Sequence, residues 1–275
     1  MSLKRTSRSW AWAAAAGAVL LVVGVRVGRA GEVSESEPAG SKAIPVDSRL
    51  AYKVEYLGIT CGHMTLESWL EDYRGKPAYH IIMTARNSSF FNQIYKVDGR
   101  IESWVDVETM STLAYTSDIT EKGKRKIKRY TIDREAGMVR AEKHGKVENI
   151  AYDGGPALDP LAFVFRGRAL AGKSGTSFTQ PILTDRGPVE TKSNVGELKR
   201  FKTADGKREL LPVQPEPAEE GVFSRKGEFV YWIDPGPDRK LYRLDAKLGW
   251  GRLVAKLIGP ADEVADRRGI EEAGE

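Results

Sequence analysis

LAYKVEYLGITCGHMTLESW, residues 50–69, is the stretch that decides the fold class of this chain. In residues 50–56, Leu, Tyr and Val side chains alternate with Ala, Lys and Glu, which is the two-residue period of a half-buried β-strand. Gly58 and Gly62 mark a turn, and the alternation resumes over residues 64–69. The stretch therefore predicts a β-hairpin.

Strand signals of the same kind continue along most of the chain. They fall at residues 79–85, 95–107, 111–119, 125–133, 138–151, 176–184, 187–195, 197–204, 228–234, 239–245 and 248–258. A sheet of that many strands has to curl, split or close, because open strand edges promote aggregation. We therefore expect a mainly β fold, either a curved antiparallel sheet or a partly closed β-barrel.

One short helix interrupts the strands. Asp159 suits the N-cap, Pro160 suits the first helical position, and Gly172 is a natural stop. The apolar residues between them follow helical spacing. The pattern predicts a helix at about 159–172 that plugs one side of the sheet.

The end of this helix matches the phosphate-binding loop pattern G-x(4)-G-K-[ST] over residues 167–174. Such a loop binds phosphate when a strand precedes it and a helix follows it, so that backbone N–H groups and the helix dipole face the anion. Here a capped helix precedes the match, and a strand-like segment follows it. We interpret the match as a helix end, and we predict no nucleotide and no cofactor.

The N-terminus predicts export. Lys4, Arg5 and Arg8 precede an apolar run at 10–25, and residues 28–30 (GRA) offer the small residues of a cleavage site. Residues 1–30 are therefore predicted to be a signal peptide, which places the protein in the periplasm. The alternative is an uncleaved anchor in the inner membrane, and membrane contact is expected only through this segment. Residues 31–46 then form a flexible linker, 47–259 a single β-rich domain, and 260–275 a disordered tail.

Net charge gives no argument for a nucleic-acid partner. The leader holds five basic residues and no acidic ones, so removing it reduces the 43 Lys and Arg to 38, equal to the 38 Asp and Glu. We therefore predict no nucleic-acid partner.

Cys61 is the only cysteine, so no intrachain disulfide can form.

Histidines and the lone cysteine raise the question of a metal site. In a strand, Cys61 and His63 point to one face and could share a metal with His80 from a neighbouring strand. We favour the alternative, a buried thiol with two ordinary histidines, and predict no metal site. The chain lacks a G-x-S-x-G nucleophile motif, so we assign no catalytic residue.

A basic cluster is the one candidate binding site. In a strand, Lys124, Lys126 and Lys128 would line one face. The functional interpretation is a surface for an anionic envelope partner, such as lipid head groups. The alternative is a solvated edge strand whose lysines discourage aggregation.

Four tryptophans fall in strand-like segments: Trp69, Trp104, Trp232 and Trp250. Aromatic residues in strands are mostly buried, so we expect each of them in the core. The alternative is that some of them line an apolar ligand cavity.

Three stretches together resemble a bacterial exported family, domain of unknown function 3108. They are 50–56 with the glycines at 58 and 62 leading into 64–66, then 159–173, and finally 231–234, 239–244 and 248–251. The resemblance covers most of residues 48–259. It implies a periplasmic protein with a β-rich, barrel-like fold and no established catalytic residues.

The resulting functional hypothesis is a non-enzymatic envelope protein that binds a hydrophobic or amphipathic ligand, such as a lipid, in a curved sheet. A second hypothesis is a structural or assembly factor that binds an envelope protein or polymer. A third and weaker one is a hydrolase with an unrecognised acidic site.

Overall fold

The computed structural model describes residues 46, 49–88, 90–91, 97–121, 123–143, 145–184, 187–216, 228–248 and 251–262. The predicted signal peptide lies outside these residues, as do nearly all of the predicted linker and tail. In this part of the chain, no helix combines the length and the apolar character needed to cross a bilayer.

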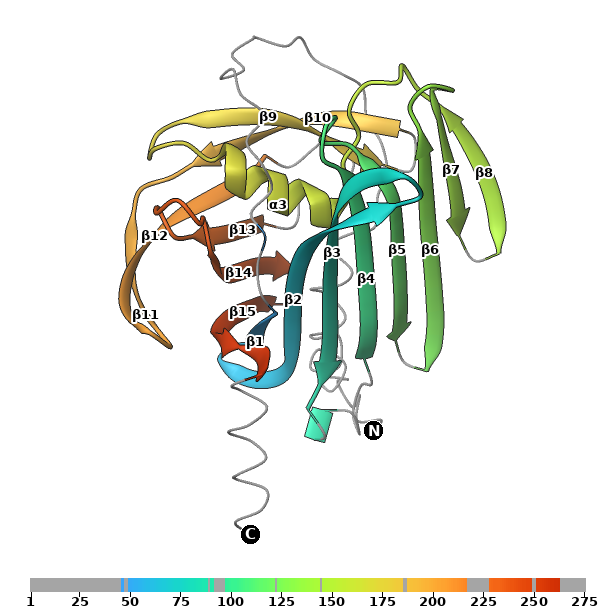
Figure 1. Ribbon diagram of the computed structural model, residues 1–275. Helices are drawn as coiled ribbons and strands as arrows, with labels where there is room; N and C mark the ends of the chain where they lie inside the picture. Colours follow the sequence, from blue (N-terminus) through green and yellow to red (C-terminus); the bar gives the residue numbers. More distant parts are fainter. Residues whose placement is uncertain are drawn as a thin grey trace, which may run out of the picture.

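The described residues form one 15-stranded sheet (Figure 1). Its order is β8-β7-β6-β5-β4-β3-β2-β1-β15-β14-β13-β12-β10-β9, and β11 pairs with β12 outside this path. The strands are β1 Leu50–Tyr56, β2 Ile59–Tyr73, β3 Lys76–Asn87, β4 Val97–Asp106, β5 Thr112–Glu121, β6 Lys124–Asp133, β7 Met138–Lys143, β8 Lys146–Ala151, β9 Ser177–Thr184, β10 Gly187–Val195, β11 Lys199–Thr203, β12 Gly206–Pro215, β13 Glu228–Ile233, β14 Leu241–Leu248 and β15 Gly251–Pro260.

The sheet is curved, and its two outer strands do not pair with each other. β8 and β9 are the ends of the strand order. The segment at 157–158 links β9 to β5, because Thr112 N donates to Ala157 O (2.8 Å) and Leu183 N donates to Leu158 O (2.7 Å). The prediction of a mainly β fold with a curved antiparallel sheet is confirmed.

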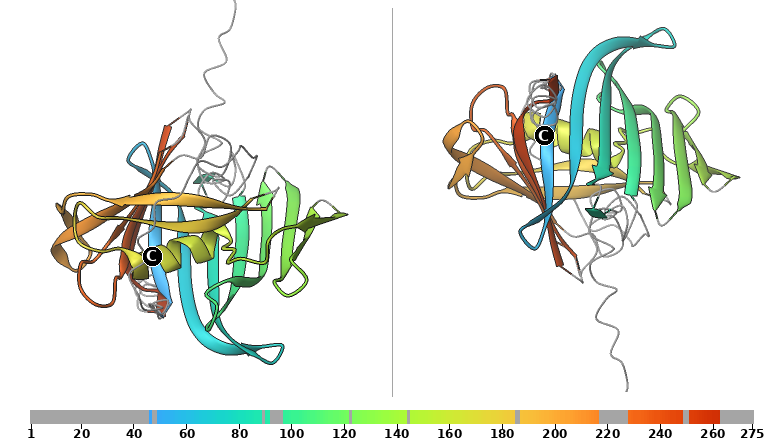
Figure 2. Two further views of the ribbon diagram at one scale, coloured as in Figure 1. Left: turned by 90° about the horizontal axis from the view of Figure 1, so that it is seen from above. Right: turned by 90° about the horizontal axis from the view of Figure 1, so that it is seen from below.

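Helix α3, Pro160–Leu170, lies in the hollow of the sheet (Figure 2). Asp159 is its N-cap and Pro160 its first residue, as predicted, although the helix ends two residues before Gly172. Phe163 and Phe165 of α3 are fully buried. We call the sheet face that packs against α3 the inner face, and the opposite face the outer face.

Strand alternation separates the core from the surface. On β1, Tyr52 and Val54 belong to the buried core of the inner face, whereas Lys53 and Glu55 belong to the outer face. Tyr52 also donates its hydroxyl to Leu241 O (2.8 Å), which ties β1 to the start of β14. The two ends of the described chain meet here, because β1 pairs with β15 as well as with β2.

The stretch at 167–174 is a helix end, as we interpreted it. Gly167 lies within α3, and β9 follows the match, so the order is the reverse of a phosphate loop. Gly167 has a packing reason instead, since a Cβ at this position would lie 2.1 Å from the Tyr231 hydroxyl oxygen. Arg168 in the same turn is buried and donates from Nε to Arg239 O (2.8 Å).

Candidate functional site

The candidate lysines of β6 lie on the inner face of the sheet. Lys126 and Lys128 are partly buried, in register with the buried side chains of Tyr130 and Ile132, and Lys124 is exposed. Lys126 Nζ donates to Glu121 Oε2 (2.6 Å). β6 lies between β5 and β7, so the alternative that it is a protected edge strand is wrong. Anion binding by these lysines stays a prediction.

The structure does not bring Cys61, His63 and His80 together. The Cys61 thiol is fully buried on β2 and contacts Val54 O at 3.4 Å. His80 pairs with Trp69, far along β2 from Cys61. Among the described residues, no group of three or more His, Cys, Asp or Glu side chains is placed to hold a metal ion.

We expect Cys61 to react at least about 100-fold more slowly than a free thiol with a thiol reagent at pH 8, because only the thiolate reacts. Burial raises the pKa of this thiol to about 11. The rate of reaction with an aromatic disulfide, measured with and without denaturant, tests this directly, since the chain has one cysteine. A native protein that reacts as fast as the unfolded one would contradict the buried position.

Two of the tryptophans expected in the core lie on the outer face instead. Trp69 and Trp104 flank the imidazole of His80, with ring centroids 4.5 and 4.3 Å from it. Both indole N–H groups donate to Glu71, at 2.9 and 2.8 Å. Burial raises the pKa of Glu71, but these hydrogen bonds prevail and lower it. His80 Nδ1 lies 3.0 Å from Glu71 Oε1, and its Nε2 lies 3.3 Å from Glu102 Oε2. The cluster is therefore partnered internally and braces β2–β4. Trp232 is buried, as expected, and Trp250 lies outside the described residues.

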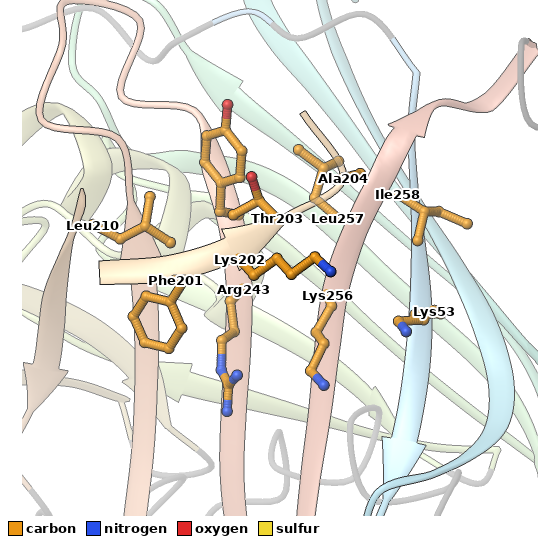
Figure 3. Close-up of a pocket in the computed structure, with 11 residues that line it drawn as sticks. Lys53, Phe201, Lys202, Thr203, Ala204, Leu210, Arg243, Lys256, Leu257 and Ile258 are labelled. Atoms are coloured by element: carbon orange, nitrogen blue, oxygen red, sulfur yellow. The ribbon is translucent and has the colours of Figure 1, made fainter. Parts of the chain in front are cut away.

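A cleft of about 340 Å³ lies between β11 and the outer face of β14, β15 and β1 (Figure 3). Its lining combines four cations with apolar and aromatic side chains: Lys53, Lys202, Arg243 and Lys256, with Phe201, Thr203, Ala204, Leu210, Tyr242, Leu257 and Ile258. The volume is within the range of small-molecule sites.

Strand register builds the floor of this cleft. Lys53 on β1 is directly opposite Lys256 on β15, which in turn is opposite Arg243 on β14. We call these three residues the basic row. Like charges directly opposite each other across strands destabilise a sheet. The row is therefore an arrangement that folding by itself does not favour.

Two carboxylates compensate the basic row in part. Glu55 contacts Lys53 (3.0 Å) and Lys256, and Asp245 accepts from Arg243 Nε (2.7 Å). Although burial raises the pKa of Glu55, the two lysine hydrogen bonds prevail and lower it. Lys202, on β11, forms no ion pair with a described residue and extends across the opening toward Lys256 (Figure 3). The cleft therefore keeps an excess of positive charge.

The β11–β12 hairpin covers the cleft and is held at two points. The ring of Phe201 meets Trp232 edge-on at 4.8 Å. At the turn, the Tyr242 hydroxyl donates to Asp205 Oδ2 (2.8 Å). Burial raises the pKa of Tyr242 to about 12, while hydrogen bonds overcome the effect of burial on Asp205 and lower its pKa to about 2. Both contacts keep the cleft formed in the absence of a ligand.

This arrangement can bind an anion that carries hydrocarbon. The cations can pair with a carboxylate or phosphate, and Phe201, Leu257 and Ile258 offer apolar contact. The described lining residues include no carboxylate, histidine or cysteine. The buried carboxylate of Asp159 caps α3 instead, so it gives the hydrolase hypothesis no support.

Sequence reasoning missed the basic row because its members are far apart in the chain. Lys53 and Lys256 become neighbours only through the β1–β15 pairing. The single local signal is a lysine on the polar side of a strongly alternating strand, and that pattern is typical of any solvated strand.

Comparison with known proteins identifies the family and the fold. The family model described as "Protein of unknown function (DUF3108)" matches residues 51–258. No curated protein matches the chain. A beta-barrel-like protein of domain of unknown function DUF1849 from Brucella abortus has a similar structure, with a TM-score of 0.53 and 13% identity over 78% of this chain and 97% of that one.

Two further structures align over similar lengths at lower scores. One is a protein from Bacteroides fragilis described as exported and as having a YmcC-like fold, with a TM-score of 0.32 and 9% identity over 80% of this chain and 99% of that one. The other is from Parabacteroides distasonis and is described as a lipoprotein, with a TM-score of 0.34 and 8% identity over 81% and 99%. Of the three, the Brucella abortus protein supports the beta-barrel-like fold, and none assigns an activity.

Proposed function

The chain belongs to the family of proteins of unknown function DUF3108, and we propose that it binds an anionic amphiphile in the cleft beneath the β11–β12 hairpin. The head group, a carboxylate or a phosphate, pairs with the basic row and Lys202. The hydrocarbon lies against Phe201, Leu257 and Ile258. This is a binding function without a chemical step.

The basic row carries the proposal. The three cations on neighbouring strands exceed the two carboxylates that pair with them by one charge, and Lys202 adds another, so an anion bound above them meets a net positive charge. Residues that violate a local folding preference often mark functional sites. The partial burial of the row strengthens its attraction for a charged group, because solvent screens it less.

The compartment that we propose is the periplasm, on the strength of the leader at residues 1–30. Amphiphiles there are supplied by the membranes of the envelope. A leader that stays attached would instead hold the protein at the inner membrane.

The first experiment is extraction of the protein isolated natively from the cell envelope, followed by mass spectrometry. It should release an anionic lipid or fatty acid, and the intact mass shows whether the leader was removed. Recovery of a lipid-free protein that also fails to take up such a ligand afterwards would contradict the proposal.

The second experiment changes the charge of the cleft. In the double variant Lys53→Gln/Lys256→Gln, we expect at least tenfold weaker binding of a fluorescent fatty acid, because charge-assisted contacts contribute about 1.5–3 kcal/mol each. The matched control is Lys192→Gln/Lys247→Gln, which removes two ion-paired lysines outside the cleft. Equal affinity of both double variants for the fatty acid would refute the role of the basic row. For an uncharged monoacylglycerol, the difference in affinity between the two double variants should be much smaller.

A further inference from the structure

One end of the sheet combines exposed apolar side chains with exposed cations. The connections β1–β2, β3–β4 and β5–β6 share this end, because the strands are antiparallel neighbours (Figure 1). Leu57, Ile59 and Phe90 are 59%, 50% and 65% exposed there. Lys124 and Arg252 are exposed at the same end and form no ion pair with a described residue. We call these five residues the tip surface.

Leu57 is an unusual residue for its backbone conformation. Its φ is 49°, and that of Gly58 is 86°. A two-residue hairpin turn with two positive φ values favours Asn-Gly, and a bulky apolar side chain in this region is disfavoured. Leu57 therefore contributes neither a favourable turn nor a buried side chain, which points to a role for its exposed surface.

Phe90 is held outward by its neighbour. Phe91 is buried in the core, and the two rings meet edge-on at 5.4 Å. The buried ring anchors this short segment, so the exposed ring cannot turn into the core without displacing it. Three apolar side chains thus stand at the tip surface beside two cations.

We infer that the tip surface docks on a bilayer that contains anionic phospholipid. Apolar side chains that enter the head-group boundary beside Lys and Arg are the combination that binds such an interface. The inference goes beyond amphiphile binding and holds whether or not the cleft is occupied.

The decisive variant is Leu57→Asn in the full chain. Asparagine suits the positive φ, so the thermal stability of Leu57→Asn should equal or exceed that of the wild-type protein. The double variant Leu57→Asn/Phe90→Ser should bind vesicles of phosphatidylcholine mixed with phosphatidylglycerol at least about tenfold more weakly than the wild-type protein. The controls are Leu70→Ser and Lys76→Gln, which change exposed residues near the opposite end of β2 and β3. Co-sedimentation with the vesicles gives the affinities.

The cations are tested by Lys124→Gln/Arg252→Gln. This variant should bind mixed vesicles at least about tenfold less tightly and lose most of the salt dependence of binding, since each basic residue adds attraction to an anionic surface. Lys53→Gln/Lys256→Gln should leave vesicle binding unchanged, which separates docking from the proposed amphiphile site.

A leader that remains attached would bind vesicles in every variant, so a local measurement is added. Amide hydrogen exchange at residues 57–58 should slow on mixed vesicles, and exchange at the turn at 74–75 should not. Absence of protection at 57–58 overturns the inference. So does a loss of self-association instead of vesicle binding in the Leu57→Asn/Phe90→Ser variant, which would make a second copy of the chain the occupant.

Discussion

Replacing Asp159 by alanine is expected to lower the free energy of unfolding by about 3–5 kcal/mol, the sum of a lost N-cap and of buried donors left without acceptors. Asp159 is fully buried. Its Oδ1 accepts from the backbone N–H groups of Leu161 (2.9 Å) and Ala162 (3.1 Å). Its Oδ2 accepts from the hydroxyls of Ser103 (2.5 Å) and Thr112 (2.8 Å). One carboxylate thus fixes the start of α3 against β4 and β5.

Urea unfolding of Asp159→Ala beside Asp153→Ala measures this effect. Asp153 caps a single backbone N–H, that of Gly155 at 2.9 Å, and this bond is exposed. Its loss should therefore cost about 1 kcal/mol or less. Equal losses in the two variants would show that α3 is not held by Asp159.

Asp159→Asn adds a pH test with a definite sign. Burial raises the pKa of the Asp159 carboxyl above its usual value, against the four hydrogen bonds, which lower it. The carboxyl therefore favours the fold most below its unfolded pKa, about 3.9, and this contribution is lost as pH rises through the folded pKa. The stability of the wild-type protein relative to Asp159→Asn should fall over that window. A difference that does not change with pH would contradict the raised pKa.

The sequence predicted correctly those strands and helix ends that are determined by residues close to each other in the chain. The alternation at 50–56 predicted β1, and the Asp159-Pro160 pair predicted the start of α3, because a strand period and a helix cap depend on residues a few positions apart. The single strand predicted at 138–151 is in fact two, β7 and β8, which are separated by a turn with Gly145 at a positive φ of 78°.

Proline hid β12 from sequence reasoning. Pro212 and Pro215 lie in β12, and proline within a run argues against a central strand. β12 tolerates them because its partners change along its length: it pairs with β11 at residues 206–210, with β13 at 211–213 and with β10 at 213–215. That change depends on the whole sheet, so no window of sequence around β12 reveals it.

The tryptophan prediction failed for a related reason. A strand shows two faces with a period of two, but the pattern does not say which face meets the core. Trp69 and Trp104 are on the outer face because their neighbours Ser68 and Ser103 point inward, where the latter bonds Asp159. A polar residue with a buried partner outweighs the usual preference of tryptophan for the interior.

Gly167→Ala is expected to destabilise the fold by about 1–3 kcal/mol, although alanine is the better helix former, because overpacking costs more than helix propensity returns. The new Cβ would lie 2.1 Å from the hydroxyl oxygen of Tyr231 and 3.1 Å from Nε2 of Gln180. Tyr231 is fully buried, so its ring has no space into which to retreat. Thermal or urea unfolding of the single variant gives the cost.

Tyr231→Phe should relieve this clash, and the double variant tests the cause. Among the described residues, the buried Tyr231 hydroxyl has no hydrogen-bond partner, so its removal should cost close to nothing. Without that oxygen, the nearest ring carbon lies 3.2 Å from the Cβ, and a shift of a few tenths of an ångström accommodates it. Gly167→Ala/Tyr231→Phe should then be at least about 1 kcal/mol more stable than Gly167→Ala, a coupling typical of residues in contact.

A different tyrosine supplies the control for this cycle. Tyr52→Phe also removes a buried hydroxyl, but that hydroxyl bonds Leu241 O. It should therefore destabilise the fold by itself and show no coupling to Gly167→Ala. Additive losses in the Gly167–Tyr231 cycle would mean that the hydroxyl is not what keeps this position a glycine. Coupling confined to that cycle would show that residue 167 is a glycine because α3 packs closely on β13. Anion binding would then not be needed to explain this glycine of the phosphate-loop match.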